Sequence, residues 1–152
     1  MKLTSKIFVT LFGIGLFPFA PGTLASIATV IIWYFYIKIF PFFSFIILII
    51  ILTILAYLLT RIYIRDIEDK DPKEIVIDEA IGQSMPLMFL NVNSDLYIIM
   101  VAFVTFRFFD IFKVYPINLS ENLPGAIGII ADDIVAGIYS IIVLMIFKLL
   151  IF

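Results

Sequence analysis

Five stretches of this sequence contain no charged residue, and they limit its fold more than any other feature. They cover residues 7–37, 42–59, 80–94, 96–106 and 134–147. A helix of about 20 apolar residues spans the hydrocarbon core of a bilayer. Because lipid offers the backbone no hydrogen bonds, helices are favoured over open strands in such segments. We therefore predict an all-α fold, a polytopic membrane helical bundle with about five membrane helices.

The composition agrees with this prediction. Hydrophobic residues make up 64% of the chain and charged residues 14%, whereas soluble domains average about 45–50% and about 25%. The net charge of −2 and the lack of a basic tail argue against a nucleic-acid partner. We expect a single domain over residues 1–152.

Glycine, proline and charged residues set the expected helix boundaries. Gly and Pro between residues 13 and 22 interrupt the first apolar run. We therefore expect an interfacial or re-entrant N-terminal segment, a loop at 13–23 and a helix at about 24–39. The second helix is expected from Phe42 to just before Pro72, and a short third crossing at 80–94. Two more helices are expected at 96–112 and 134–147, with a loop at 114–128 between them.

Basic residues indicate the orientation in the membrane. Lys2 and Lys6, the basic residues of the charged segment 61–74, and Arg107 with Lys113 should lie on the cytoplasmic side. This orientation places the 13–23 loop and the charged residues discussed below at one cytoplasmic depth.

Two local patterns are interpreted as unrelated to function. The N-terminus resembles a signal peptide, but glycines and Pro18 interrupt its apolar run, and we expect it to remain in the mature protein. The DKD tripeptide at 69–71 resembles a phosphatase DxD motif, but no predicted strand precedes it. We interpret it as a solvent-exposed turn.

Two adjacent acid pairs open apolar segments. They are Asp78–Glu79 in IVIDEAIG and Asp132–Asp133 in AIGIIADDIVAG. Acids in a first helical turn are stabilised by the helix dipole, so each pair alone is explained by a helix start. Two such pairs in apolar surroundings favour a functional site.

The stretch FRFFDIFK holds Arg107, Asp110 and Lys113 among aromatic residues. Steps of three residues place them on one broad side of a helix. A local ion pair with a lysine extending to the membrane surface is the simple explanation. Charges at membrane depth cost about 2.5–3.5 kcal/mol each, however, so they also suggest function.

The sum of these charges indicates a metal site. Five acids and two cations give −3 in one cleft, and two like charges 4 Å apart repel by about 4 kcal/mol at an effective dielectric of 20. The chain has no His and no Cys, so the natural ion is a hard one, Mg²⁺ or Mn²⁺. A metal with Arg and Lys would bind an anion, and a phosphate ester is the obvious one.

Four motifs in this order resemble the phosphatidylglycerophosphatase A family of bacterial Mg²⁺-dependent lipid phosphatases: GIGLFPFAPGTLAS, EIVIDEAIGQ, FRFFDIFKVYP and AIGIIADDIVAGI. The resemblance runs from about residue 12 to residue 141. It implies hydrolysis of phosphatidylglycerophosphate in the bilayer to phosphatidylglycerol and phosphate. The location implied is the bacterial cytoplasmic (inner) membrane, with several crossings and the active site on the cytoplasmic side.

The resemblance also implies site residues. The family's signature positions are Pro21, Gly22, Thr23, Asp78, Glu79, Gly82, Arg107, Asp110, Lys113, Gly128, Asp132, Asp133 and Gly137. Together with the charge pattern, they predict catalytic roles for Asp78, Glu79, Arg107, Asp110, Lys113, Asp132 and Asp133. The predicted Mg²⁺ ligands are Asp78, Glu79, Asp132 and Asp133, and the predicted phosphate-binding residues are Gly22, Thr23, Arg107 and Lys113. Ala25, Val114 and Ala126 depart from the family pattern, but no charged signature residue is lost.

Two other functions remain as alternatives. A membrane transporter for an ion or small anion would place charges through the depth of the membrane. A non-catalytic membrane assembly protein would not need five acids around two cations. For a phosphatase, the attacking group is either water or an aspartate, and the sequence leaves this choice and the oligomeric state open.

Overall fold

The computed structural model describes residues 2–65, 67, 72–120 and 123–151, and this part of the chain is helical, with no β-strand. The all-α prediction is therefore confirmed. The elements are α1 (Lys2–Val9), the 3₁₀ helix η1 (Ile14–Leu16), α2 (Pro21–Ile39), α3 (Phe42–Ile64), α4 (Ile77–Leu87), α5 (Leu96–Phe112), α6 (Ile117–Ser120) and α7 (Ala126–Ile151).

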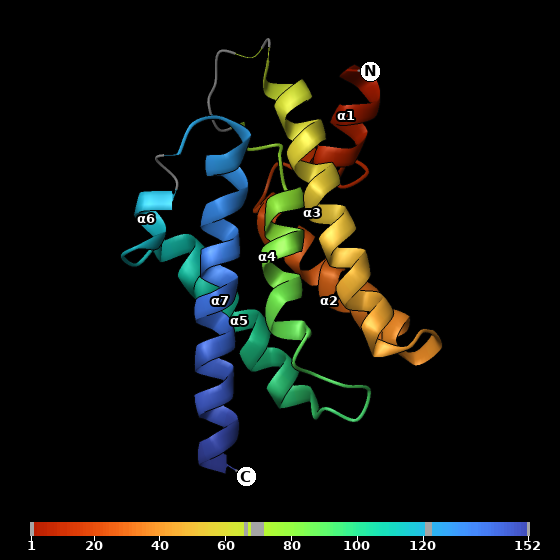
Figure 1. Cartoon of the computed structure of the whole chain (residues 1–152), viewed down its shortest axis with the longest axis vertical. Coiled ribbons are helices and arrows are strands. Elements are labelled where there is room, and N and C mark those ends of the chain that lie inside the picture. The colour runs from red at the N-terminus through yellow and green to blue at the C-terminus, as the bar shows by residue number, and fades with distance from the viewer. Residues whose placement is uncertain (1, 66, 68–71, 121–122, 152) are drawn as a thin grey trace.

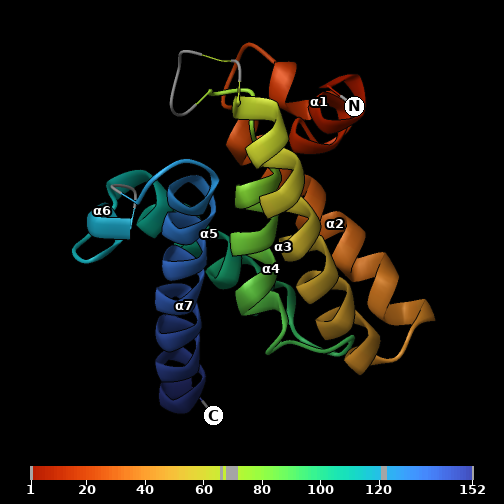
Figure 2. The same cartoon turned by 45° about the horizontal axis from the view of Figure 1, so that its top comes forward.

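Helix α4 lies at the centre of the bundle. It packs against α2, α3, α5 and α7, while the short α1 packs against α3 (Figure 1). Most of its side chains are buried, including Asp78 and Gln83. The view in Figure 2 shows α2 and α3 on one side of α4, with α7 on the other. A buried central helix can hold polar groups in a fixed place, and α4 carries the first acid pair.

Within the part of the chain that the structure describes, three helices are long and apolar enough to cross a membrane: α2, α3 and α7. Their outer faces expose large apolar side chains, such as Ile32 on α2, Ile50 on α3 and Ile146 on α7, as expected of surfaces in contact with lipid. Helices α4 and α5 have 11 and 17 residues. The number of crossings, expected to be about five, therefore stays a prediction.

Two glycines allow α4 and α7 to approach closely. A β-carbon at Gly137 would lie 2.7 Å from the carbonyl oxygen of Gly82, and one at Gly82 would lie 2.6 Å from the carbonyl oxygen of Asp133. Small residues permit this kind of close helix contact in membrane proteins. The contact places Asp133 of α7 beside the start of α4.

Several helix boundaries differ from those expected. Helix α2 begins at Pro21 rather than 24, because the fixed φ of proline suits the first helical position. Helix α7 begins at Ala126 rather than 134, directly after Gly125 with its φ of 62°. The expected 114–128 loop also contains α6. Asp132 and Asp133 consequently lie in the second turn of α7 rather than the first.

The second apolar helix was expected to reach almost to Pro72, but α3 ends at Ile64. The amide of Ile67 donates to the carbonyl of Ile64 at 3.2 Å, and a bond of this short-range type closes a last helical turn. The DKD tripeptide at 69–71 lies outside the described residues.

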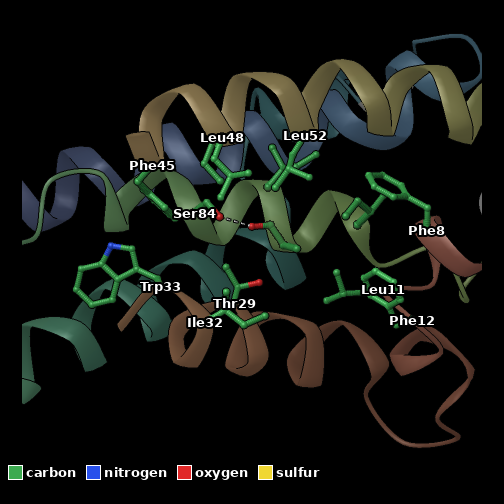
Figure 3. Close-up of a pocket in the computed structure, with 14 residues that line it drawn as sticks. Phe8, Leu11, Phe12, Thr29, Ile32, Trp33, Phe45, Leu48, Leu52 and Ser84 are labelled. Carbon is green, nitrogen blue, oxygen red and sulfur yellow. Dashed lines mark hydrogen bonds between the residues drawn. The ribbon is translucent and has the colours of Figure 1, made fainter. Parts of the chain in front are cut away.

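Helices α2, α3 and α4 enclose an apolar cavity of about 180 Å³ that carries no charged side chain (Figure 3). Thr29 and Trp33 of α2, Leu48 of α3 and Ser84 of α4 line it. The hydroxyl of Ser84 is satisfied within its own helix, since it donates to the carbonyl of Ala80 at 2.7 Å. On α4 this cavity is lined by Ile77, Ala80, Ile81 and Ser84, and the acid pair does not contribute to it.

Candidate active site

One cavity of about 380 Å³ brings together every charged residue for which the sequence predicted a catalytic role. It is formed where α2, α4 and α7 begin and α5 ends. Its charged lining comprises Asp78, Glu79, Arg107, Asp110, Lys113, Asp132 and Asp133, together with Lys73. The predicted phosphate-binding residues Gly22 and Thr23 also line it. Residues 13–19 of the predicted loop do not.

Three carboxylates form the centre of this site. Asp78, Glu79 and Asp133 each offer an oxygen, and these oxygens lie within 4.8 Å of one another. Asp78 and Asp133 are buried and Glu79 is partly buried. An oxygen-only set of this kind fits a hard divalent cation such as Mg²⁺.

Burial makes this cluster unfavourable without a counter-charge. It raises the pKa of Asp78 well above its usual range, and the neighbouring charge of Glu79 adds to the effect. Burial also raises the pKa of Glu79 to about 7. Both residues precede the apolar part of α4. A bound cation would reverse these shifts, since it favours the ionised carboxylates.

Four of the other charged side chains form two ion pairs at the wall of the cavity. Lys113 Nζ lies 2.9 Å from Asp132 Oδ2, and Arg107 Nη1 lies 2.5 Å from Asp110 Oδ2. The predicted ligand Asp132 thus lies in the cavity, but it contacts Lys113 and is outside the three-carboxylate cluster. Its role as a metal ligand stays a prediction.

Glu79 Oε2 and Arg107 Nε are among the buried polar atoms of the site that have no hydrogen-bond partner within the described residues. A buried polar atom left unpaired costs about 1–3 kcal/mol, so such atoms usually meet a ligand, an ion or water. The two atoms are of opposite charge, as a site for a cation and an anion together requires.

The start of α2 completes the cavity. Ala20 precedes the helix with a φ of 45°, and no side chain caps the first turn. The first amides of a helix have no intrahelical acceptor and favour an anion. Gly22 and Thr23 lie in this turn and line the cavity, and their role in phosphate binding stays a prediction.

The sequence analysis missed Lys73, which lines the cavity from the segment before α4. It lies in the highly charged stretch that was interpreted as facing solvent. The only signal was its position five residues before Asp78.

Of the departures from the family pattern, Ala25 is buried within α2 and Ala126 begins α7, while Val114 is exposed.

Comparison with known proteins identifies the family. The family model of phosphatidylglycerophosphatase A matches residues 7–148. The chain belongs to the phosphatidylglycerophosphatase A family. The resemblance seen in its motifs is therefore confirmed.

The chain is similar to two curated proteins named phosphatidylglycerophosphatase A and to one further phosphatase. It is 35% identical to phosphatidylglycerophosphatase A of Escherichia coli, over 85% of this chain and 74% of that one. It is 35% identical to phosphatidylglycerophosphatase A of Haemophilus influenzae, over 87% and 81%. A Bacteroides thetaiotaomicron protein, described provisionally as a phosphatidylinositol-3-phosphatase, is 32% identical over 88% of this chain and 86% of its own length. No solved structure matches the chain.

Proposed function

We propose that this chain is a phosphatidylglycerophosphatase, a membrane enzyme that hydrolyses phosphatidylglycerophosphate to phosphatidylglycerol and inorganic phosphate. One observation carries the proposal. In a member of this family, three clustered carboxylates, two cationic side chains and an uncapped helix start line the same cavity. The chain would act as a single domain over residues 1–152.

Asp78, Glu79 and Asp133 would hold Mg²⁺ through their clustered oxygens, with the predicted ligand Asp132 at the same cavity. When bound, the ion would neutralise charge on the phosphate oxygens and act as a Lewis acid.

The cationic side chains would bind the terminal phosphate. Arg107 has a planar guanidinium that can donate to two phosphate oxygens at once. Its contact with Asp110 fixes its orientation on α5. Lys113 would contribute a compact positive charge, held toward the cavity by Asp132. The amides at the start of α2 would donate to the remaining oxygens.

The position of the site suits a lipid substrate. The charged cavity lies at one end of the bundle, whereas the outer faces of α2, α3 and α7 are apolar. We place this end at the cytoplasmic surface of the inner membrane, where the head group would enter the cavity while the acyl chains stay in the bilayer. A transporter for an ion or small anion would need charges through the membrane depth. Neither the family nor the relatives support that alternative.

A second candidate substrate is phosphatidylinositol 3-phosphate, because the Bacteroides relative is described by that activity. The test is phosphate release by the purified protein from each lipid in mixed micelles, with Mg²⁺ and with excess chelator. We expect release from phosphatidylglycerophosphate to be faster and to stop in chelator. A faster reaction on the inositol lipid would favour the second candidate. No release from either lipid would refute both.

A further inference from the structure

Lys73 provides a third positive charge at the active-site cavity. It lines the cavity from the segment that leads into α4, and its side chain is exposed. Arg107 and Lys113 each contact a carboxylate of the cavity. Within the described residues, Lys73 has no ion pair or hydrogen bond. No carboxylate of the described residues therefore competes with a ligand for its charge.

The segment that carries Lys73 is held in place by its neighbour Glu74. The Glu74 carboxylate lies 3.2 Å from Lys6 Nζ of α1 and accepts a hydrogen bond from the hydroxyl of Tyr63 on α3. Glu74 is thus anchored to α1 and α3, while Lys73 contributes to the cavity.

Backbone contacts fix the same segment. The amide of Ile75 donates to the carbonyl of Pro72 at 2.9 Å, and the amide of Val76 donates to the carbonyl of Val9 at 2.9 Å. The Glu74 carbonyl also packs against Gly15, where a β-carbon would lie only 1.9 Å from the carbonyl oxygen. The backbone of Lys73 is therefore held in a fixed turn. This lowers the conformational entropy that is lost when the side chain binds a ligand.

A lipid with a terminal phosphate on its head group has two anionic parts. The proposed function assigns the terminal phosphomonoester to Arg107, Lys113 and the start of α2. The phosphodiester that joins the head group to the diacylglycerol is also negative, and the five acids of the cavity would repel it. A positive charge at the cavity wall would offset this repulsion.

We propose that Lys73 binds the phosphodiester of the lipid, so that the enzyme selects lipids carrying both a phosphodiester and a terminal phosphomonoester. This inference rests on the proposed function. Phosphatidylglycerophosphate and phosphatidylinositol 3-phosphate share this chemistry. Phosphatidic acid has the monoester without the diester and should not use Lys73.

The test compares Lys73→Gln, Lys73→Arg and wild type on these three lipids in mixed micelles with Mg²⁺. The matched control is Lys38→Gln, which removes the same charge at the far end of α2, where Lys38 Nζ lies 3.9 Å from the centre of the Tyr34 ring. We expect Lys73→Gln to raise KM for the two-phosphate lipids about fivefold, the loss expected for one partly exposed charge contact, with kcat unchanged. Lys73→Arg should restore most of the affinity.

Phosphatidic acid distinguishes recognition of the phosphodiester by Lys73 from a general electrostatic attraction of anionic lipids to the cavity. It is followed as a substrate or, if it is not turned over, as an inhibitor, and its KM or Ki should be the same in Lys73→Gln and wild type. The two-phosphate lipid that wild type hydrolyses faster identifies the head group, glycerol or inositol. An equal loss of affinity for phosphatidic acid, or an unchanged KM for the two-phosphate lipids, would overturn the inference alone. Absence of phosphate release by wild type would overturn the proposed function and this inference with it.

Discussion

Gly22, at the start of α2, lies directly against the Glu79 carboxylate of α4. A β-carbon at position 22 would lie 1.9 Å from Glu79 Oε1 and 3.3 Å from Arg107 Nη1. The two residues are far apart in the sequence, yet their contact sets the position of the acid cluster relative to the predicted phosphate site. Any side chain at position 22 must displace the carboxylate.

Substitution of this glycine should therefore impair catalysis more than folding. We expect Gly22→Ala to lower turnover of phosphatidylglycerophosphate at least about tenfold, because small displacements of catalytic groups are costly. Ala25→Gly is the control, since it changes α2 one turn later without a clash and costs about 1 kcal/mol of helix stability. Turnover and melting temperature in detergent are measured for both. Equal losses of turnover in the two variants would contradict the role of the Gly22–Glu79 contact.

The three-carboxylate cluster should couple a metal to stability as well as to activity. In wild type, Mg²⁺ should raise the melting temperature, because an ion that binds only the folded state stabilises it. Glu79→Gln and Asp133→Asn should lose this rise and reduce turnover by at least about a hundredfold.

Asp95→Asn serves as the control, since Asp95 precedes α5 outside the cavity. It should keep both the Mg²⁺-dependent rise and full activity. The assignment would be wrong if Glu79→Gln and Asp133→Asn also kept them.

Arg107 should not be replaceable by lysine. Arg107→Lys keeps the charge but removes the planar fork that grips two phosphate oxygens. We expect a strong loss of turnover with a melting temperature close to wild type. If the only role of Arg107 were to extend its charge from the helix to the membrane surface, a lysine would reach that surface equally well. Turnover of Arg107→Lys would then be near normal.

Glu74 should contribute stability that depends on pH. Its hydrogen bond from Tyr63, with the nearby Lys6, lowers its pKa. A carboxyl with a lowered folded pKa stabilises the protein above its unfolded pKa of about 4.3, and this contribution is lost as the pH falls through the folded value. Melting temperatures measured from neutral pH down into the acid range should fall less steeply in Glu74→Gln than in wild type. Parallel curves would exclude this contribution.

The sequence predicted which charged residues lie together, but not how the fold brings them into one cavity. The acid pairs and FRFFDIFK marked the charged residues because charge is rare in such apolar surroundings, and all of them line one cavity. The contact of Gly22 with Glu79 was not predictable, because periodicity within a helix does not indicate which helices meet. Lys73 was missed for a similar reason, since nothing in the sequence separates it from the other charges of its segment, and its place at the cavity is seen only in the fold. Helices α2 and α7 begin earlier than expected, next to Pro21 and Gly125. The sequence analysis had placed both residues inside loops, although each of them also suits a helix boundary.

The candidate active-site cavity takes its lining residues from helices far apart in the chain, from Gly22 on α2 to Asp133 on α7. As the protein leaves the ribosome, Asp78 and Glu79 are therefore made well before the carboxylate that completes their cluster. The three carboxylates of the cluster are all present only once the start of α7 has been made, so the cluster cannot form early in synthesis. The order of synthesis therefore delays the assembly of the cluster until α7 packs against α4.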